Sequence, residues 1–188
     1  SLPLITIARR TLVMNKRNQT GVVAAVCLSV QPGLPKSPSS QIQLIKDHGV
    51  NGDYHAGKYI RHRYLAKKDP ERLNNRQVLL VDMVIHKTVL SQGIQLAPGD
   101  LGENILVEGI DLMSLQIGCR LQICSAVVEL TEVRDPCYQL DEVHPGLQGA
   151  VEIQVKGESK PMAGMLAVVL EGGIIQPGDQ VLVLETTV

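Results

Sequence analysis

The chain has almost no aromatic residues: its 188 residues include four Tyr and neither Phe nor Trp. Hydrophobic residues still make up 44% and charged residues 20%, which is ordinary for a globular protein. The core must therefore be built from Val, Leu, Ile and Ala. Proteins that bind single-stranded nucleic acids stack the bases on aromatic side chains, so this scarcity argues against nucleic acid as a partner.

Long apolar segments are also missing. No stretch approaches the ~18 consecutive apolar residues that span a bilayer. The start, SLPLITIARR, lacks the charged region, long apolar run and cleavage site of a signal peptide. The sequence therefore predicts a cytoplasmic protein with no membrane partner. Its length and the lack of a dividing linker predict one domain, residues 1–188.

The four cysteines form no CxxC pair and show no dense disulfide spacing. This pattern favours reduced thiols over disulfides, and it argues against a structural zinc site. Cys27 lies in the apolar run AAVCLSV, where a buried structural cysteine is the expected outcome. Cys119 and Cys124 are five residues apart on a strand-like segment, so they point to opposite faces and cannot readily chelate together.

Short runs rich in Val and Ile, separated by turn residues, predict a mainly β fold. The runs are LITIAR (4–9), GVVAAVCLSV, IQLIK, RQVLLV, NILVEG, CRLQICSAVVELTEV, MLAVVLEGG and QVLVLE. Pro-Gly-Asp turns at 98–100 and 177–179 each precede a strand-like run. Many short strands with few helices predict a closed or nearly closed β-barrel with a few peripheral short helices.

Helix signals are few. Segment 82–93 has Asp82 as a helix N-cap and Gly93 as a terminator, and further short helices are predicted after Pro136 and within 61–75. Two segments are expected to be loops: QPGLPKSPSS (31–40), where Pro, Ser and Gly disfavour regular structure, and DHGVNGDYHAGKY (47–59).

Positive charge is concentrated in the first part of the chain. Residues 1–76 hold 13 Lys/Arg against 4 Asp/Glu, and Lys58–Arg76 alone holds seven basic residues against two acidic ones. This segment is either a solvated surface or a positive wall that faces an anionic ligand such as a phosphate. The two alternatives are compatible.

The stretch ELTEVRDPCYQL (129–140) places Cys137 at a turn among charges. Asp135 is a favoured N-cap and Pro136 a favoured first helical residue, which would put Cys137 at the second helical position. The peptide dipoles of a first turn and the nearby Arg134 would both favour a thiolate, while Asp135 would oppose it. Such a thiolate could be a nucleophile, a persulfide carrier or a soft metal ligand, and the alternative is an inert cysteine.

Two glycine-rich loops are candidates for binding a ligand through the backbone. HGVNGDYHAG (48–57) carries His48 and His55, which could bind a metal, hydrogen-bond a pterin or phosphate, or simply belong to a turn. PGDLGENI (98–105) offers backbone amides and Asn104, whose side chain both donates and accepts. No G-x-S-x-G elbow, P-loop or G-x-G-x-x-G motif is present.

Taken in order, several of these motifs resemble the MOSC domain, the family named for the C-terminal domain of molybdenum cofactor sulfurases. They are GVNGDYHAG, RQVLLVD, APGDLGENILVEGIDLMSLQIGCRLQI, AVVELTEVRDPCYQL and GMLAVVLEGGIIQPGDQVLV. The resemblance covers about residues 20–185. Their combined order is much more specific than any one motif.

The resemblance implies a MOSC-type (PK β-barrel-like) fold that binds the molybdenum cofactor, molybdopterin, or handles its sulfur. It implies that Cys137 is the catalytic residue and the protein ligand to molybdenum. The matching positions implied to bind the cofactor are Gly52, Asp53, His55, Arg76, Gly102, Glu103, Asn104 and Arg134, with Tyr54 in the same loop.

The departures from the family's larger members limit the function. The chain has no aminotransferase-like domain for pyridoxal phosphate, no additional N-terminal domain, and no iron–sulfur or flavin motif. It therefore resembles the small stand-alone bacterial MOSC proteins. The leading expectation is an oxidoreductase that reduces N-hydroxylated small molecules with electrons from a separate reductase. The alternatives are a carrier that takes a persulfide on Cys137 from a separate desulfurase, and a binding domain without chemistry.

Overall fold

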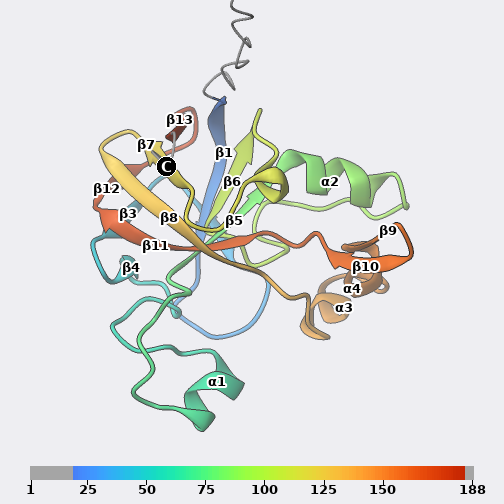
Figure 1. The fold of residues 1–188 in the computed structure, drawn as a ribbon, viewed down its shortest axis with the longest axis horizontal. Helices are drawn as coiled ribbons and strands as arrows, with labels where there is room; N and C mark the ends of the chain where they lie inside the picture. Colours follow the sequence, from blue (N-terminus) through green and yellow to red (C-terminus); the bar gives the residue numbers. More distant parts are fainter. Residues whose placement is uncertain (1–18, 185–188) are drawn as a thin grey trace, which may run out of the picture.

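The computed structural model describes residues 19–184, so the predicted strand LITIAR (4–9) lies outside the described residues. Seven strands form a closed barrel in the order β13-β7-β8-β11-β5-β6-β1, which pairing between β13 and β1 completes (Figure 1). All neighbouring pairs are antiparallel except β5 and β6. The strands are β1 (Thr20–Leu28), β5 (Val78–Asp82), β6 (Ile105–Glu108), β7 (Arg120–Ile123), β8 (Ala126–Val133), β11 (Met165–Glu171) and β13 (Gln180–Leu184). The predicted mainly β-barrel fold is confirmed.

Aliphatic side chains fill the barrel, as the composition requires. Strands such as β8 alternate buried and partly exposed residues, because successive side chains of a strand point to opposite faces. Strand β5 is buried on both faces, since a second apolar cluster covers its outer side. That cluster joins the barrel to helices α2 (Met83–Leu90), α3 (Gln139–Val143) and α4 (Leu147–Ala150).

Helix α2 supplies the crossover between the parallel strands β5 and β6. Its N-terminus is capped as predicted: Asp82 Oδ1 accepts from the backbone N–H of Ile85 at 3.0 Å. The other carboxylate oxygen accepts from the N–H of Leu112 at 2.8 Å. At the far end, Gly93 N–H donates to Leu90 and Ile94 N–H donates to Val89, the paired bonds that typically end a helix at glycine.

The remaining elements lie outside the seven-stranded barrel. They are β2 (Ser37–Ser39), β3 (Ile42–Ile45), β4 (Gly49–Val50), β9 (Glu152–Val155), β10 (Glu158–Pro161), β12 (Gly173–Ile175) and a 3₁₀ turn at Leu112–Ser114. The prediction that 31–40 has no regular structure is wrong for β2, which pairs with the end of β1. Pro38 is tolerated there because an edge strand needs hydrogen bonds on one side only.

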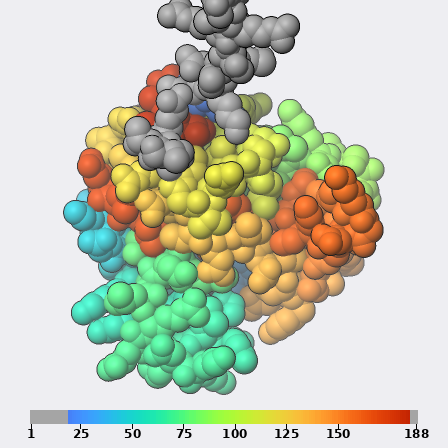
Figure 2. All heavy atoms as spheres, viewed as in Figure 1, coloured from blue at the N-terminus to red at the C-terminus, as the bar shows by residue number. Residues whose placement is uncertain are grey.

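Residues 58–75 form a hairpin-like arm that extends from the barrel and carries helix α1 (Arg63–Lys68). The base is tied by bonds from Ile60 N–H to Arg72 O and from Asn74 N–H to Lys58 O, both 2.9 Å. Helix α1 itself buries no side chain. The arm, coloured teal to green, forms a lobe below the barrel (Figure 2). Both short helices predicted from the sequence, within 61–75 and after Pro136, are present.

Within residues 19–184, no helix is long and apolar enough to cross a membrane. The predicted cellular location stays a prediction.

Candidate functional site

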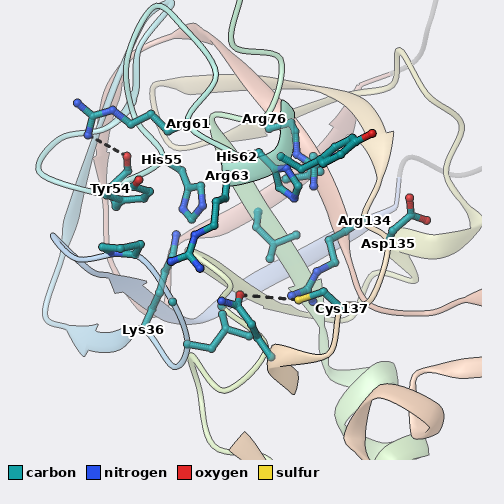
Figure 3. A pocket seen from close by; sticks show the side chains of 18 of the residues that line it. Lys36, Tyr54, His55, Arg61, His62, Arg63, Arg76, Arg134, Asp135 and Cys137 are labelled. Atoms are coloured by element: carbon teal, nitrogen blue, oxygen red, sulfur yellow. Dashed lines mark hydrogen bonds between the residues drawn. The ribbon is translucent and has the colours of Figure 1, made fainter. Parts of the chain in front are cut away.

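A cavity of about 440 Å³ opens where the arm approaches the barrel. Its walls include the loop before β2, the loop after β4, the arm, the loop before β6 that holds Gly102, and the chain that leaves β8 (Figure 3). The lining includes Lys36, Tyr54, His55, Arg61, His62, Arg63, Tyr64, Lys67, Arg76, Gly102, Arg134, Asp135, Cys137, Tyr138 and Gln139.

Cys137 lies half-buried in the wall of this cavity, just beyond the end of β8. The prediction that it occupies the second position of a helix is wrong. Helix α3 begins at Gln139 and Tyr138 is its N-terminal flanking residue, so Asp135 caps nothing. Pro136 disfavours helical backbone at Asp135, and the N–H of Arg134 still pairs with Gly164 O at 3.0 Å, so the chain stays extended.

The cation expected beside Cys137 is present. Arg134 is buried and donates from Nη1 to Ala163 O at 3.2 Å, and its guanidinium lies next to the thiol in Figure 3. Burial lowers the pKa of Arg134 from its usual value, and a negative Cys137 raises it again. Because a guanidinium stays charged in proteins, it places a fixed positive charge beside the Cys137 side chain. The other contact of Cys137 Sγ is weak, at 3.8 Å from Gln139 Oε1.

Six cations line the cavity against one carboxylate, that of Asp135. The cations are Lys36, Arg61, Arg63, Lys67, Arg76 and Arg134. Lys36 pairs with Asp53 at 3.0 Å and Arg76 pairs with Glu132. Within residues 19–184, the remaining four have no carboxylate partner. Part of the basic segment Lys58–Arg76 therefore forms the positive wall predicted from the sequence.

Two histidines of the wall are electrically neutral at pH 7. Burial lowers the pKa of His55 to about 4, and the nearby charge of Lys36 adds to the effect. Burial and the charge of Arg76 also lower the pKa of His62. The Nδ1 atom of His62 is buried without a hydrogen-bond partner among the described residues. The His62 side chain lines the cavity, although this atom itself is enclosed by protein.

No cluster of three or more His, Cys, Asp or Glu side chains that could hold a metal ion occurs within residues 19–184. His48, proposed above as a possible partner of His55, is not among the residues that line the cavity. A metal held here would have Cys137 as its protein ligand and would bring its other ligands with it.

Four of the predicted cofactor-binding residues do not line the cavity. Asp53 holds Lys36 and accepts from the backbone N–H groups of Ser29 and His55. Gly52 is an exposed residue of the same loop with φ of 83°, a conformation that favours glycine.

The other two of these residues are Glu103 and Asn104. Buried Glu103 accepts from the N–H groups of Gly99 and Leu101, which shapes the loop that presents Gly102 to the cavity. Asn104 joins two strands: its side chain accepts from Leu79 N–H and donates to Cys27 O, both at 3.1 Å.

The structure also adds lining residues that the sequence did not single out. Lys36 lies in a Pro- and Ser-rich loop that showed no binding pattern. His62 and Tyr64 likewise belong to no recognisable motif, and Tyr138 lies in the Cys137 motif but was given no role there. Only the concentration of basic residues on the arm pointed toward this wall.

The model of the MOSC domain family matches residues 53–182, a segment that holds the arm, the Gly102 loop and Cys137. The chain belongs to the MOSC domain family. The match leaves out Lys36, although its loop forms part of the same cavity.

Solved structures with the same fold include three bacterial proteins. The YuaD protein of Bacillus subtilis is 22% identical with a TM-score of 0.74, over 91% of this chain and 99% of that one. YiiM of Geobacillus stearothermophilus is 20% identical with a TM-score of 0.57, over 89% of this chain and 73% of that one. YiiM of Escherichia coli is 15% identical with a TM-score of 0.55, over 88% and 71%. A search of curated protein sequences finds no match. At these identities the likeness shows the fold.

Proposed function

We propose that this MOSC protein binds the molybdenum cofactor, molybdopterin, in the cavity and reduces N-hydroxylated small molecules there. The observation that carries the proposal is the Cys137 thiol beside the desolvated Arg134, at the wall of a cavity lined by cations. The electrons would come from a separate reductase, because no flavin or iron–sulfur motif appears in the sequence.

The side chains of the cavity fit this cofactor. A thiolate is a soft ligand that suits molybdenum, and a single protein ligand suffices because the dithiolene of the pterin supplies two more sulfurs. The cavity volume of about 440 Å³ lies within the usual range for small-molecule sites, roughly 300–1,000 Å³. Bound in this way, the cofactor would supply two-electron redox chemistry beside Cys137.

The remaining groups would hold the pterin. Arg134 and Arg76 provide charge for its phosphate, and Arg76 is already oriented by its ion pair with Glu132. The neutral imidazole of His62 lines the cavity and would pack beside the heterocycle. His55 is neutral as well, so at pH 7 it serves as a hydrogen-bond partner and not as a source of charge.

The overall reaction takes two electrons and two protons per turnover. The N–O bond of the substrate breaks, the nitrogen gains a proton to give the reduced amine or amidine, and the hydroxyl leaves as water. The protein's own part is to hold the substrate's N–OH group near Cys137 and to keep solvent from the cofactor.

The direct test is molybdenum per chain in protein purified from a host that makes the cofactor. We expect close to one molybdenum for the wild type and almost none for Cys137→Ser. Cys124→Ser is the matched control, because Cys124 is exposed and precedes β8, whereas Cys137 follows it. Wild-type protein without molybdenum from such a host would refute cofactor binding. Bound molybdenum without reduction of benzamidoxime would refute the reaction alone.

A second function, sulfur carriage, is favoured because Cys137 belongs to no group of three or more His, Cys, Asp or Glu side chains that could hold a metal within residues 19–184. Here the Cys137 thiolate would attack the outer sulfur of a donor persulfide on a separate desulfurase. The S–S bond of the donor breaks, its thiolate leaves, and Cys137 keeps the persulfide. Cyanide-releasable sulfur on metal-free wild type that disappears in Cys137→Ser would support this function, and its persistence in that variant would refute it.

A further inference from the structure

The few aromatic residues of this chain gather at the cavity. Three of its four tyrosines, Tyr54, Tyr64 and Tyr138, line it, and none lies in the barrel core. Tyr54 already has neighbours, because His55 packs against its ring edge-on and Arg61 lies 5.4 Å from its centre. Tyr64 and Tyr138 are exposed by 69% and 63%. A protein that builds its core without aromatics thus presents two unused rings at this opening.

The arm places two like charges together on the same side. Arg63 and Lys67 are four residues apart on α1, so their side chains project from one face of the helix, and both line the cavity. Like charges at this spacing destabilise a helix, and α1 has six residues and no buried side chain to compensate. Neither residue has a carboxylate partner within residues 19–184. An anion between them would remove the repulsion.

Two cations of the arm are left over once the cofactor's phosphate is assigned to Arg134 and Arg76, as proposed above. A phosphate monoester carries at most about two negative charges. Four lining cations lack a carboxylate partner among the described residues, and only Arg134 of these belongs to the barrel wall. Arg61 lies over Tyr54, so Arg63 and Lys67 are the cations left for a second anion.

We propose that the substrate is a planar aromatic N-hydroxylated compound that bears an acidic group. This inference rests on the proposed function and names its substrate class. The acidic group binds between Arg63 and Lys67, and the ring lies against Tyr64 and Tyr138. The N–OH group then points along the cavity toward Cys137. Ring stacking and a charged contact together hold a small molecule whose reacting end makes few contacts of its own.

The test compares two probes that differ by one charge, 4-carboxybenzamidoxime and benzamidoxime. Their dissociation constants are measured by equilibrium dialysis at low salt, with cofactor-loaded and cofactor-free protein. We expect the cofactor-loaded protein to bind 4-carboxybenzamidoxime at least fivefold more tightly than benzamidoxime. In Arg63→Gln and in Lys67→Gln the ratio of the two dissociation constants should fall toward one. Lys160→Gln, which removes an exposed charge from β10, should keep it.

The aromatic part is tested by Tyr64→Leu and Tyr138→Leu, which should weaken both probes by similar factors of at least three. The matching Phe variants should restore binding, since stacking needs the ring and not the hydroxyl.

Equal affinities for the two probes, or a preference that survives both charge variants, would overturn the inference. So would a preference found only in cofactor-free protein, because the arm would then be holding the cofactor itself. A clear preference in loaded protein without any reduction of either probe would sustain the anion site and refute the proposed reaction. Reduction of both probes with equal KM would support the proposed reaction and refute the anion site.

Discussion

Lys36 Nζ lies 3.0 Å from Asp53 Oδ2, and the two side chains are only 3% and 0% exposed. The pair joins the loop before β2 to the loop after β4, two walls of the cavity that are distant in sequence. Burial lowers the pKa of Lys36, while Asp53 raises it again. The carboxylate also accepts from Ser29 and His55 N–H, so one buried anion holds both loops together.

Asp53→Asn should therefore destabilise the fold strongly, by about 3–5 kcal/mol, because it leaves the Lys36 ammonium buried and unpaired. Denaturant unfolding measures the loss. Glu129→Gln is the matched control: Glu129 pairs with Arg120 at 2.9 Å, but both side chains are substantially exposed, so removing that pair should cost under about 1 kcal/mol. Equal losses in the two variants would contradict the structural role of the buried pair.

His55 makes stability depend on pH in a defined window. Its pKa is about 4 in the folded protein and near 6.5 when unfolded, so between these values the unfolded chain binds the extra proton. The free energy of unfolding should fall as the pH drops from 6.5 to 4. In His55→Gln this part of the pH dependence should vanish, which unfolding curves at pH 7, 5.5 and 4.5 would reveal. An unchanged slope in the variant would mean that other groups cause it.

The charge of the cavity should select between alkylating reagents. Iodoacetate is negative and iodoacetamide is neutral. The rate with iodoacetate divided by the rate with iodoacetamide should therefore be roughly tenfold higher at Cys137 than at exposed Cys124 at low salt. Peptide mapping after brief labelling gives both rates. Cys27 should stay unlabelled, because burial raises the pKa of its thiol to about 12. Arg134→Gln should slow labelling of Cys137 by both reagents, and added salt should lower the ratio.

Asn104 was predicted to bind the cofactor, whereas its side chain bonds to two strands of the barrel, so its structural role can be tested by mutation. Asn104→Ala removes the side-chain partners of Leu79 N–H and Cys27 O inside the barrel, at about 1–3 kcal/mol for each buried group left unpaired. We expect a lower unfolding midpoint in denaturant with an unchanged slope. A variant as stable as the wild type would show that these two bonds do not hold the strands together.

Local sequence patterns were sufficient where a structure is stabilised by near neighbours. The alternation of aliphatic residues predicted the barrel strands, and Asp82 and Gly93 marked the two ends of α2 correctly. The helix start predicted at Asp135-Pro136 was wrong. A long-range hydrogen bond from Arg134 N–H to Gly164 O keeps this stretch extended, and the helix begins at Gln139. Local preference loses where a tertiary hydrogen bond satisfies the backbone instead.

The sequence by itself determined that the chain forms an aliphatic β-barrel, that it resembles the MOSC family, and that Cys137 is the cysteine to consider. Tertiary structure alone decided which polar residues face the cavity: Lys36 and His62 line it, while Glu103 and Asn104 do not. The physical reason is that the walls come from several segments far apart in the chain. Whether a polar side chain meets a ligand or a neighbouring strand depends on contacts that no local pattern encodes.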